Sequence, residues 1–206
     1  RMQIRRERRR VCEESGIRVE VRRGAAEISR ALLKHMFYIY RSTIEKMMFW
    51  GNQYLNMEFF EMLADSDDKS LLNSVVLILA YDDESAGQSD EEQMPIAGTV
   101  NFVDGNAFYG RYWGALREVR DCHFEVCYYR AIEYVIEHGL MRMEPGAGGG
   151  EFKSMRGFQP VETQSAHWCV DPRLQSFVER YCTMEAAYVV DEIAEMRQAM
   201  PVRRPA

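Results

Sequence analysis

The apolar positions along the chain switch repeatedly between a helical and an extended spacing. Apolar side chains that recur every three or four residues predict helices over residues 1–14, 26–48, 55–64, 122–138 and 172–199. Alternating or continuously apolar stretches predict strands over residues 17–21, 74–81, 95–103, 106–113, 140–144 and 161–170. The stretch SVVLILAY (74–81) is apolar almost throughout, so we expect a strand that is buried on both faces.

These elements predict one mixed α/β domain over residues 1–206. After a basic N-terminal helix in residues 1–15, the expected order is β-α-α-β-β-β-α-β-α-β-α, in which the short helix lies within residues 145–158. Residues 82–94 are acidic and lack apolar anchors, which indicates a solvated loop insertion, and residues 201–206 are expected to be a loose tail.

Turn and capping residues support these boundaries. Asp104-Gly105 is a strong hairpin signal between two strands, and the return strand is expected to place three side chains on one face: Tyr109, Arg111 and Trp113.

Two helices carry capping signals at their ends. Asp121 stands at the N-cap position of the helix over 122–138, and Gly139 stands at its C′ position. Asp171-Pro172 combines an N-cap residue with proline at the first helical position, so the last helix should begin there. The core candidates in that helix are Phe177, Tyr181 and Val189.

Composition and charge exclude several classes of protein. The chain has 206 residues, of which 47% are apolar and 28% charged, as in globular proteins rather than disordered ones. The net charge of −6 argues against a general nucleic-acid coat, and five cysteines without framework spacing favour a reducing compartment. No apolar run approaches about 18 residues, so we expect a cytoplasmic protein without a membrane partner. Because the chain begins with Arg, we also expect it to be part of a longer protein.

The charge is unevenly distributed. Residues 1–23 hold nine Arg against four Glu, whereas residues 61–92 hold ten acidic residues against one Lys. The basic N-terminal helix has two interpretations, a solvated face or an anion-binding surface.

The richest cluster of chemically active side chains lies between Phe108 and Tyr129. It falls at a strand end and the start of the next helix, where mixed sheets often bind ligands. Its aromatic members can also be simple core residues. The candidates are Tyr109, Arg111, Trp113, His123, Glu125, Tyr128 and Tyr129.

The glycine-rich stretch PGAGGGEFKSMRGF (145–158) is a second candidate, because clustered backbone N–H groups can bind anions. It departs from both the Walker A loop and the dinucleotide fingerprint, so a flexible turn remains the alternative. Lys153 and Arg156 are three residues apart and could face the same anion.

Cys122, His123 and Cys127 raise the possibility of a metal or thiol site. A closed zinc site needs four ligands, and no second pair stands nearby at a usual spacing, so we predict no metal site. Cys127 lies on the apolar stripe of its helix and is expected to pack rather than to act as a nucleophile. A redox or metal protein built on the five cysteines is a weak alternative.

The segments FYGRYWG, HFEVCYYRAIEYVIEHGL, EPGAGGGEFK, RGF and SAHW, in this order, resemble the FemAB-like (peptidoglycan biosynthesis/recognition) family. That family belongs to the acyl-CoA N-acyltransferase (GCN5-related, GNAT) superfamily, and the resemblance extends from about Arg5 to the final helix. It implies a GNAT-like fold and a chain that corresponds to the C-terminal half of longer family members, whose N-terminal lobe is missing here. Three further binding candidates lie in these segments: Glu144, Gly146 and His167.

The resemblance also implies an activity. Related Fem enzymes transfer an amino acid from aminoacyl-tRNA to a peptide amine of a cell-wall precursor, and other superfamily members use acyl-CoA as the donor. No bound cofactor is therefore implied beyond acyl-CoA as a possible donor. The family's usual turn PGAQGEHK is PGAGGGEFK in this chain, one residue longer and with Phe152 in place of His, which removes a proton-handling group.

The leading hypothesis is transfer of an acyl or aminoacyl group to a primary amine of a small molecule or peptide. Backbone N–H groups of a splayed strand would polarise the donor carbonyl. Glu125 or His123 would accept the proton of the amine, and Tyr128 or Tyr109 would serve the leaving group. The cations for an anionic donor would be Arg111, Lys153 and Arg156. The alternative is a non-catalytic GNAT-like module that binds a peptide or glycan precursor.

Overall fold

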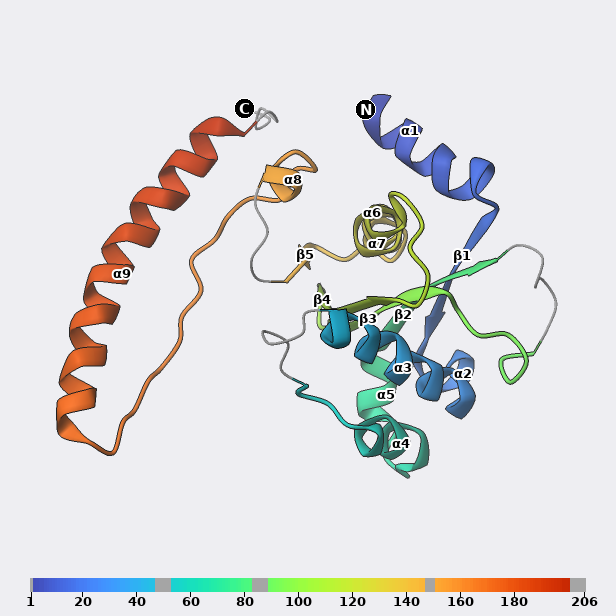
Figure 1. The fold of residues 1–206 in the computed structure, drawn as a ribbon, viewed down its shortest axis with the longest axis horizontal. Helices are drawn as coiled ribbons and strands as arrows, with labels where there is room; N and C mark the ends of the chain where they lie inside the picture. The colour runs from blue at the N-terminus through green and yellow to red at the C-terminus, as the bar shows by residue number, and fades with distance from the viewer. Residues whose placement is uncertain (1, 47–52, 83–88, 147–150, 201–206) are drawn as a thin grey trace. The chain divides into compact units, whose positions relative to one another are not determined.

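A computed structural model describes residues 2–46, 53–82, 89–146 and 151–200 (Figure 1). The chain divides into two compact units, Arg1–Gly146 and Ala147–Ala206, which are described separately below. The expected grouping of residues 1–206 into one domain stays a prediction.

The first unit is built on a five-stranded sheet in the order β1-β2-β3-β4-β5. The strands β1 (Ile17–Arg23), β2 (Val75–Asp82), β3 (Ala97–Asp104) and β4 (Ala107–Ala115) are antiparallel neighbours. The short strand β5 (Arg142–Glu144) pairs with β4 in the parallel sense. Helices cover both faces of this mixed sheet, so the predicted α/β class and the first five predicted strands are confirmed (Figure 1).

Strand β2 lies between two hydrophobic layers, one on each face of the sheet. Leu77 and Leu79 belong to the core cluster on the face covered by α3 (Arg30–Lys46) and α4 (Met57–Asp65). Val76 and Ile78 belong to the cluster on the opposite face. All four side chains are fully buried, which confirms that this apolar run is covered on both sides.

The helices before β2 differ in detail from the prediction. The segment 26–48 is not one helix: α2 (Gly24–Glu27) and α3 are separated at Ile28, which is extended, and the Ser29 hydroxyl accepts a hydrogen bond from the N–H of Leu32. Residues 47 and 48 lie outside the described residues. A further short helix, α5 (Ser70–Ser74), precedes β2 and was not predicted.

The basic N-terminal segment forms a helix, as predicted. It consists of α1 (Met2–Arg9) followed by the π-helical turn η1 (Arg10–Glu14).

The helix predicted over 122–138 contains an unpredicted π-helical turn. Its parts are α6 (Cys122–Phe124), the π-turn η4 (Glu125–Tyr129) and α7 (Arg130–Glu137). Gly139 has φ +64° after the last turn, which confirms the predicted C′ glycine. Asp121 stands at the predicted N-cap position, where its backbone carbonyl accepts a hydrogen bond from the N–H of Glu125 at 3.1 Å. Its side chain caps no N–H, however: the residue has φ +67°, and its carboxylate is paired with Arg10.

The hairpin between β3 and β4 is present, but β4 carries a bulge. The turn residues are Gly105 and Asn106, one position later than expected, and Asp104 pairs with Ala107. Further along, Asn101 pairs with Gly110 and Val100 with Tyr112, so Arg111 is an extra residue.

The bulge reverses the alternation of side chains along β4. The expectation that Tyr109, Arg111 and Trp113 share one face is therefore wrong. Phe108, next to Tyr109, and Trp113 both pack in the layer beneath α6 and α7, which places Tyr109 on the other face.

The described residues of the second unit, 151–200, contain two helices, α8 (Glu151–Ser154) and α9 (Pro172–Ala199). The Asp171 carboxylate accepts a hydrogen bond from the N–H of Arg173 at 2.8 Å, and Pro172 opens the helix, as predicted. The strand predicted over 161–170 is absent: this stretch is extended but pairs with no strand among the described residues, and ladder hydrogen bonds require a partner.

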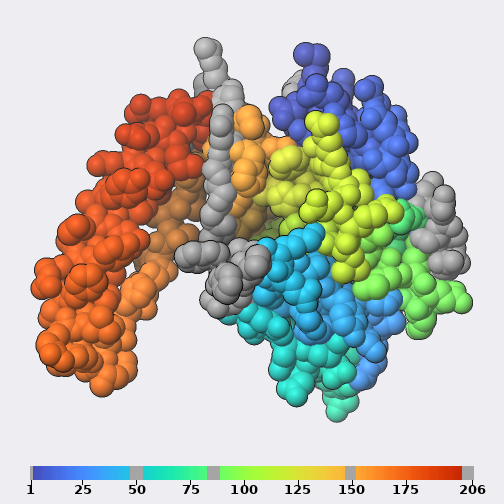
Figure 2. Space-filling model, in the orientation of Figure 1, coloured from blue at the N-terminus to red at the C-terminus, as the bar shows by residue number. Residues whose placement is uncertain are grey.

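The expected core residues of α9 are not buried. Phe177 and Tyr181 are 58% and 54% exposed, Val189 is only partly covered, and α9 has no buried residue. Figure 2 shows the surface of α9 in orange to red. No helix in the described ranges is both long enough and apolar enough to cross a membrane.

Candidate functional site

Strands β4 and β5 separate after three residue pairs. Pairing begins at Ala107 with Arg142 and ends at Tyr109 with Glu144, whereas β4 continues to Ala115. At the point of separation Gly110 still lies against β5, because a Cβ atom on it would be in ordinary contact, 3.5 Å, with the carbonyl oxygen of Glu144. Beyond Tyr109, β4 therefore has an edge that β5 does not cover, and the bulge lies in this part of the strand.

Gly146 permits the chain to leave β5 at this point. It has φ +88°, a conformation that favours glycine, and its added Cβ would meet the carbonyl oxygen of Gly110 at 3.4 Å. Of the glycine-rich stretch, residues 147–150 lie outside the described residues.

A polar group marks the end of the β4–β5 pairing. Arg142 donates a hydrogen bond from Nη2 to the hydroxyl of Tyr109 at 3.0 Å, and its guanidinium lies 5.9 Å from the centre of that ring. The same side chain places Nε 3.2 Å from Oε1 of Glu144. Two predicted residues, Tyr109 and Glu144, thus meet through Arg142, which was not predicted.

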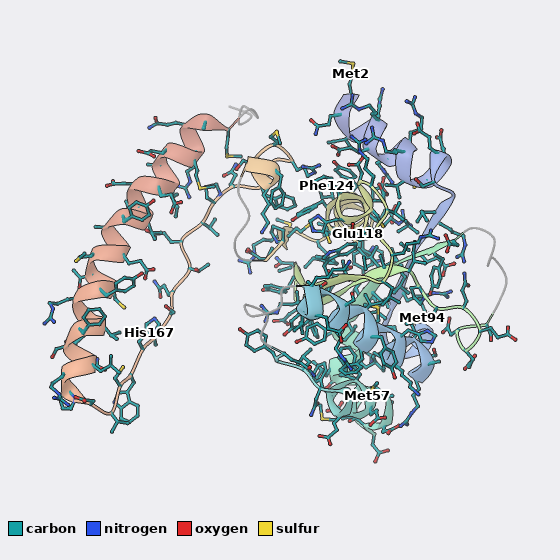
Figure 3. All side chains as sticks on the ribbon, viewed as in Figure 1. Met2, Met57, Met94, Glu118, Phe124 and His167 are labelled. Atoms are coloured by element: carbon teal, nitrogen blue, oxygen red, sulfur yellow. The ribbon has the colours of Figure 1, made fainter. Side chains whose placement is uncertain are left out.

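An aromatic group lies beside the uncovered part of β4. The ring of His123 is 5.1 Å from that of Trp113 and 5.6 Å from that of Tyr128, both in edge-to-face geometry. Phe124 adjoins His123 and Tyr128 at the start of the helix (Figure 3). The structure therefore brings three predicted residues from β4 and the following helix together.

The π-turn explains why His123 and Tyr128 meet. Residues five apart lie about 140° apart around a regular α-helix, which has 3.6 residues per turn. In a π-helical turn the hydrogen bond spans five residues, so side chains at i and i+5 come onto one face. The extra residue in η4 thus brings Tyr128 against His123, whose ring also contacts Trp113.

Glu125 faces a different environment, formed by α1. Its carboxylate is 1% exposed and accepts hydrogen bonds from Arg8: Nε lies 3.2 Å from Oε1 and 3.1 Å from Oε2, and Nη2 lies 3.0 Å from Oε1. The guanidinium of Arg8 also pairs with Glu133, with Nη2 3.0 Å from Oε2. Tyr129 lies on this side too, where its hydroxyl donates to the buried carboxylate of Glu7.

The two carboxylates on Arg8 have opposite pKa shifts. Burial raises the pKa of Glu125, and the charge and hydrogen bonds of Arg8 oppose this only in part. The hydrogen bond from Arg8 lowers the pKa of Glu133, which is more exposed. Arg8 itself has a raised pKa, chiefly because of its hydrogen bond to Glu133.

The remaining predicted cations belong to different units of the chain. Arg111 is exposed at the bulge, and its guanidinium lies 5.3 Å from the ring centre of Tyr112. Lys153 and Arg156 belong to the second unit, where Arg156 donates to the carbonyl of Phe152 at 2.9 Å. His167 is also in that unit, exposed on the extended segment before α9 and 3.0 Å from the hydroxyl of Ser165 (Figure 3). Convergence of these residues with the first unit's site stays a prediction.

No metal site is formed in the parts of the chain that the structure describes, since no group of three His, Cys, Asp or Glu side chains could hold an ion there. In the same parts, Cys122 is buried, and burial raises the pKa of its thiol to about 12. A thiol with that pKa is almost entirely protonated at neutral pH and is therefore a poor nucleophile.

A family model described as peptidoglycan biosynthesis/recognition matches residues 1–204. The chain belongs to this FemAB_like family. No curated protein matches the chain.

Solved structures similar to this FemAB_like chain are distant. L-PGS from Bacillus licheniformis is 9% identical with a TM-score of 0.40, over 63% of this chain and 34% of L-PGS. The PaiA N-acetyltransferase from Thermoplasma acidophilum, in complex with coenzyme A, is 14% identical with a TM-score of 0.35, over 60% of this chain and 75% of its own.

A third similar structure is the aminoglycoside N-acetyltransferase AAC(6')-Iy in complex with CoA, which is 10% identical with a TM-score of 0.40, over 76% of this chain and 97% of its own. Two of these three structures are N-acetyltransferases. The FemAB_like chain spans only about a third of the length of L-PGS. Because all three TM-scores are below 0.5, these similarities support no conclusion about activity.

Sequence reasoning missed Arg8 as a partner of this FemAB_like site. The available signal was the basic N-terminal helix together with acidic residues at 125 and 133, eight apart on one helix face. Arg8 pairs with Glu125 and Arg10 with Asp121. Three other arginines of the same segment are exposed: Arg5, Arg6 and Arg9. The exposed arginines are consistent with either interpretation of the basic helix, a solvated face or an anion-binding surface.

Proposed function

We propose that this FemAB_like chain transfers an acyl or aminoacyl group from a thioester or aminoacyl-tRNA donor to a primary amine. The observation that carries the proposal is the β4 edge left uncovered by β5, with the aromatic group of Trp113, His123 and Tyr128 beside it. The family description supports a peptide amine of a peptidoglycan precursor as the acceptor.

The uncovered edge is suited to hold an extended donor. Backbone N–H groups of a strand edge that lacks a partner strand are oriented donors, and they can stabilise the negative charge that develops on a carbonyl oxygen during acyl transfer. Their orientation is set by the sheet before the reaction, so little reorganisation is needed.

His123 is the better placed of the two candidate bases. An amine acceptor must lose a proton to attack the donor carbonyl, and an imidazole can accept it near neutral pH. His123 is only partly buried and lies beside Trp113. Both carboxylate oxygens of Glu125, in contrast, accept hydrogen bonds from Arg8, and the side chain is buried.

Tyr128 would donate the proton that the departing thiolate or ribose oxygen takes up.

The test is an assay of the full-length protein with acetyl-CoA or alanyl-tRNA as donor and a muropeptide amine as acceptor. We expect His123→Gln to lower kcat by about 100-fold or more, since a general base contributes at least that much. His138→Gln is the matched control, because His138 is an exposed histidine at the end of the same helix. Undiminished transfer by His123→Gln would remove His123 from the mechanism.

The second candidate is a non-catalytic module that binds a peptide or glycan precursor. It is favoured by the engagement of Glu125 with Arg8, which withdraws one of the two possible bases. Calorimetry separates the candidates: binding of coenzyme A or aminoacyl-tRNA supports the transferase, whereas muropeptide binding without donor binding supports the module.

A further inference from the structure

The last turn of α3 is attached directly to the backbone of β4. The hydroxyl of Thr43 donates to the carbonyl oxygen of Trp113 at 2.7 Å, and Nζ of Lys46 donates to the carbonyl oxygen of Ala115 at 3.1 Å. The Ser42 hydroxyl lies 2.6 Å from the carbonyl oxygen of Ile39 and 3.2 Å from that of Ala115. Because a hydroxyl has one hydrogen, Ser42 mainly serves its own helix.

Gly114 allows this contact. A Cβ atom at this position would overlap the carbonyl oxygen of Ile39 and lie 2.5 Å from its carbonyl carbon. The backbones of α3 and β4 therefore touch at Gly114, and the Thr43 and Lys46 bonds lie on either side of that contact.

These bonds limit the uncovered part of β4. Trp113 and Ala115 are two residues apart, so their carbonyls project toward the same side of the strand. Pairing with β5 ends at Tyr109, and the hydrogen bonds from α3 begin at Trp113. The stretch left between them is Gly110–Tyr112, which contains the bulge residue Arg111.

Thr43 also connects the two faces of the sheet. It belongs to α3, which covers one face, whereas the Trp113 ring packs in the layer on the opposite face and contacts His123. The Thr43 hydrogen bond therefore holds the backbone from which the Trp113 ring reaches the candidate base.

We propose that Thr43 is a positioning residue for acyl transfer, which acts through the Trp113 backbone and sets the point on β4 where the donor's acyl end stops. This inference rests on the function proposed above. Thr43 touches neither donor nor acceptor in this scheme. Loss of its hydroxyl leaves the carbonyl of Trp113 without this donor and loosens the strand at the site.

The test compares Thr43→Val, which removes the hydroxyl at nearly constant shape, with Thr43→Ser, which keeps it. Thr183→Val is the matched control, since the Thr183 hydroxyl donates only to the carbonyl of Glu179 within α9. The first readout is amide hydrogen exchange of peptides spanning 110–115 in the full chain without ligand. We expect Thr43→Val to exchange about five- to ten-fold faster there, as the loss of one hydrogen bond implies, and both other variants to match the wild type.

The second readout is steady-state transfer with the donor and acceptor used above. We expect Thr43→Val to lower kcat about tenfold with the acceptor KM little changed, because the acyl group is misplaced rather than unbound. Thr43→Ser should restore kcat. Wild-type exchange in Thr43→Val, or an unchanged kcat in an active protein, would overturn the inference. If the wild type transfers nothing, the proposed function fails, and the exchange result still decides whether Thr43 holds β4.

Discussion

The two faces of the helix over residues 122–137 carry different chemistry, although their residues are interleaved in the sequence. Toward β4, His123 and Tyr128 form an aromatic group with Trp113. Toward α1, Glu125 and Tyr129 take part in buried polar contacts. The run HFEVCYY therefore does not form one site. These residues are close in sequence and were therefore predicted as one site. The π-turn places some of them on the face toward β4 and others on the face toward α1.

The difference separates a face suited to chemistry from a face that holds the fold together. A buried carboxylate with a raised pKa has the properties of a general base, which made Glu125 an attractive candidate. Its oxygens are nevertheless occupied by Arg8, which comes from a segment 117 residues earlier in the chain. The aromatic face, in contrast, borders the uncovered edge of β4 through Trp113.

The largest expected effect is on the charged face. Arg8→Met would leave the Glu125 carboxylate buried without its cation, and breaking a buried ion pair from one side is strongly destabilising. Because Arg8 is 35% exposed, we expect a loss at the low end of the known range, about 3 kcal/mol in the free energy of unfolding at neutral pH. Urea denaturation measures this.

The control for that variant is Arg9→Met. Arg9 and its partner Glu14 are 58% and 54% exposed, so the loss should stay below about 1 kcal/mol. Equal losses in the two variants would mean that the ion pair on Glu125 has no special role.

The adjacent tyrosines offer a direct comparison of the two faces. Tyr129→Phe removes a hydrogen bond to the buried carboxylate of Glu7, and we expect a stability loss of about 1–3 kcal/mol with transfer activity little changed. For Tyr128→Phe we expect instead that kcat is lowered about tenfold or more. Denaturation and the transfer assay on both variants measure the two effects, and identical behaviour would contradict the division into two faces.

The smallest expected effects are on the pH dependence of stability. The two carboxylates that pair with Arg8 should change it in opposite directions. The pKa of Glu125 is raised in the folded state, so folding is favoured by its protonated form. The stability of the wild type relative to Glu125→Gln should therefore fall as pH rises above about 4.3, the ordinary glutamate pKa. The pKa of Glu133 is lowered, so the stability of the wild type relative to Glu133→Gln should fall as pH decreases below about 4.3.

Urea denaturation of the wild type and both variants between about pH 3 and pH 7 measures these slopes. Slopes of the same sign for the two carboxylates would show that they do not share Arg8 in the way described.

Most helices and strands were predictable, whereas the candidate site was predictable only in part. The membership of Trp113, His123 and Tyr128 followed from their clustering in the sequence, and their contacts are now observed. The role of Arg8 and the attachment of Thr43 to β4 were not predictable, since each depends on a partner about 70 residues or more away. The prediction of a sixth strand was wrong for the same reason. Residues 161–170 have a strand-like pattern, but a strand forms only where another strand pairs with it.

By itself, the sequence determined the features that depend on local periodicity and local hydrogen bonds. The doubly buried strand β2, the helix after Asp121 and the Asp171 cap of α9 are of this kind, because burial patterns and caps are encoded within a few neighbouring residues. Only the tertiary structure decided where Arg111 is extruded, how η4 brings Tyr128 against His123, and which cation neutralises Glu125. Those outcomes depend on strand register and on long-range packing, for which no local pattern carries the information.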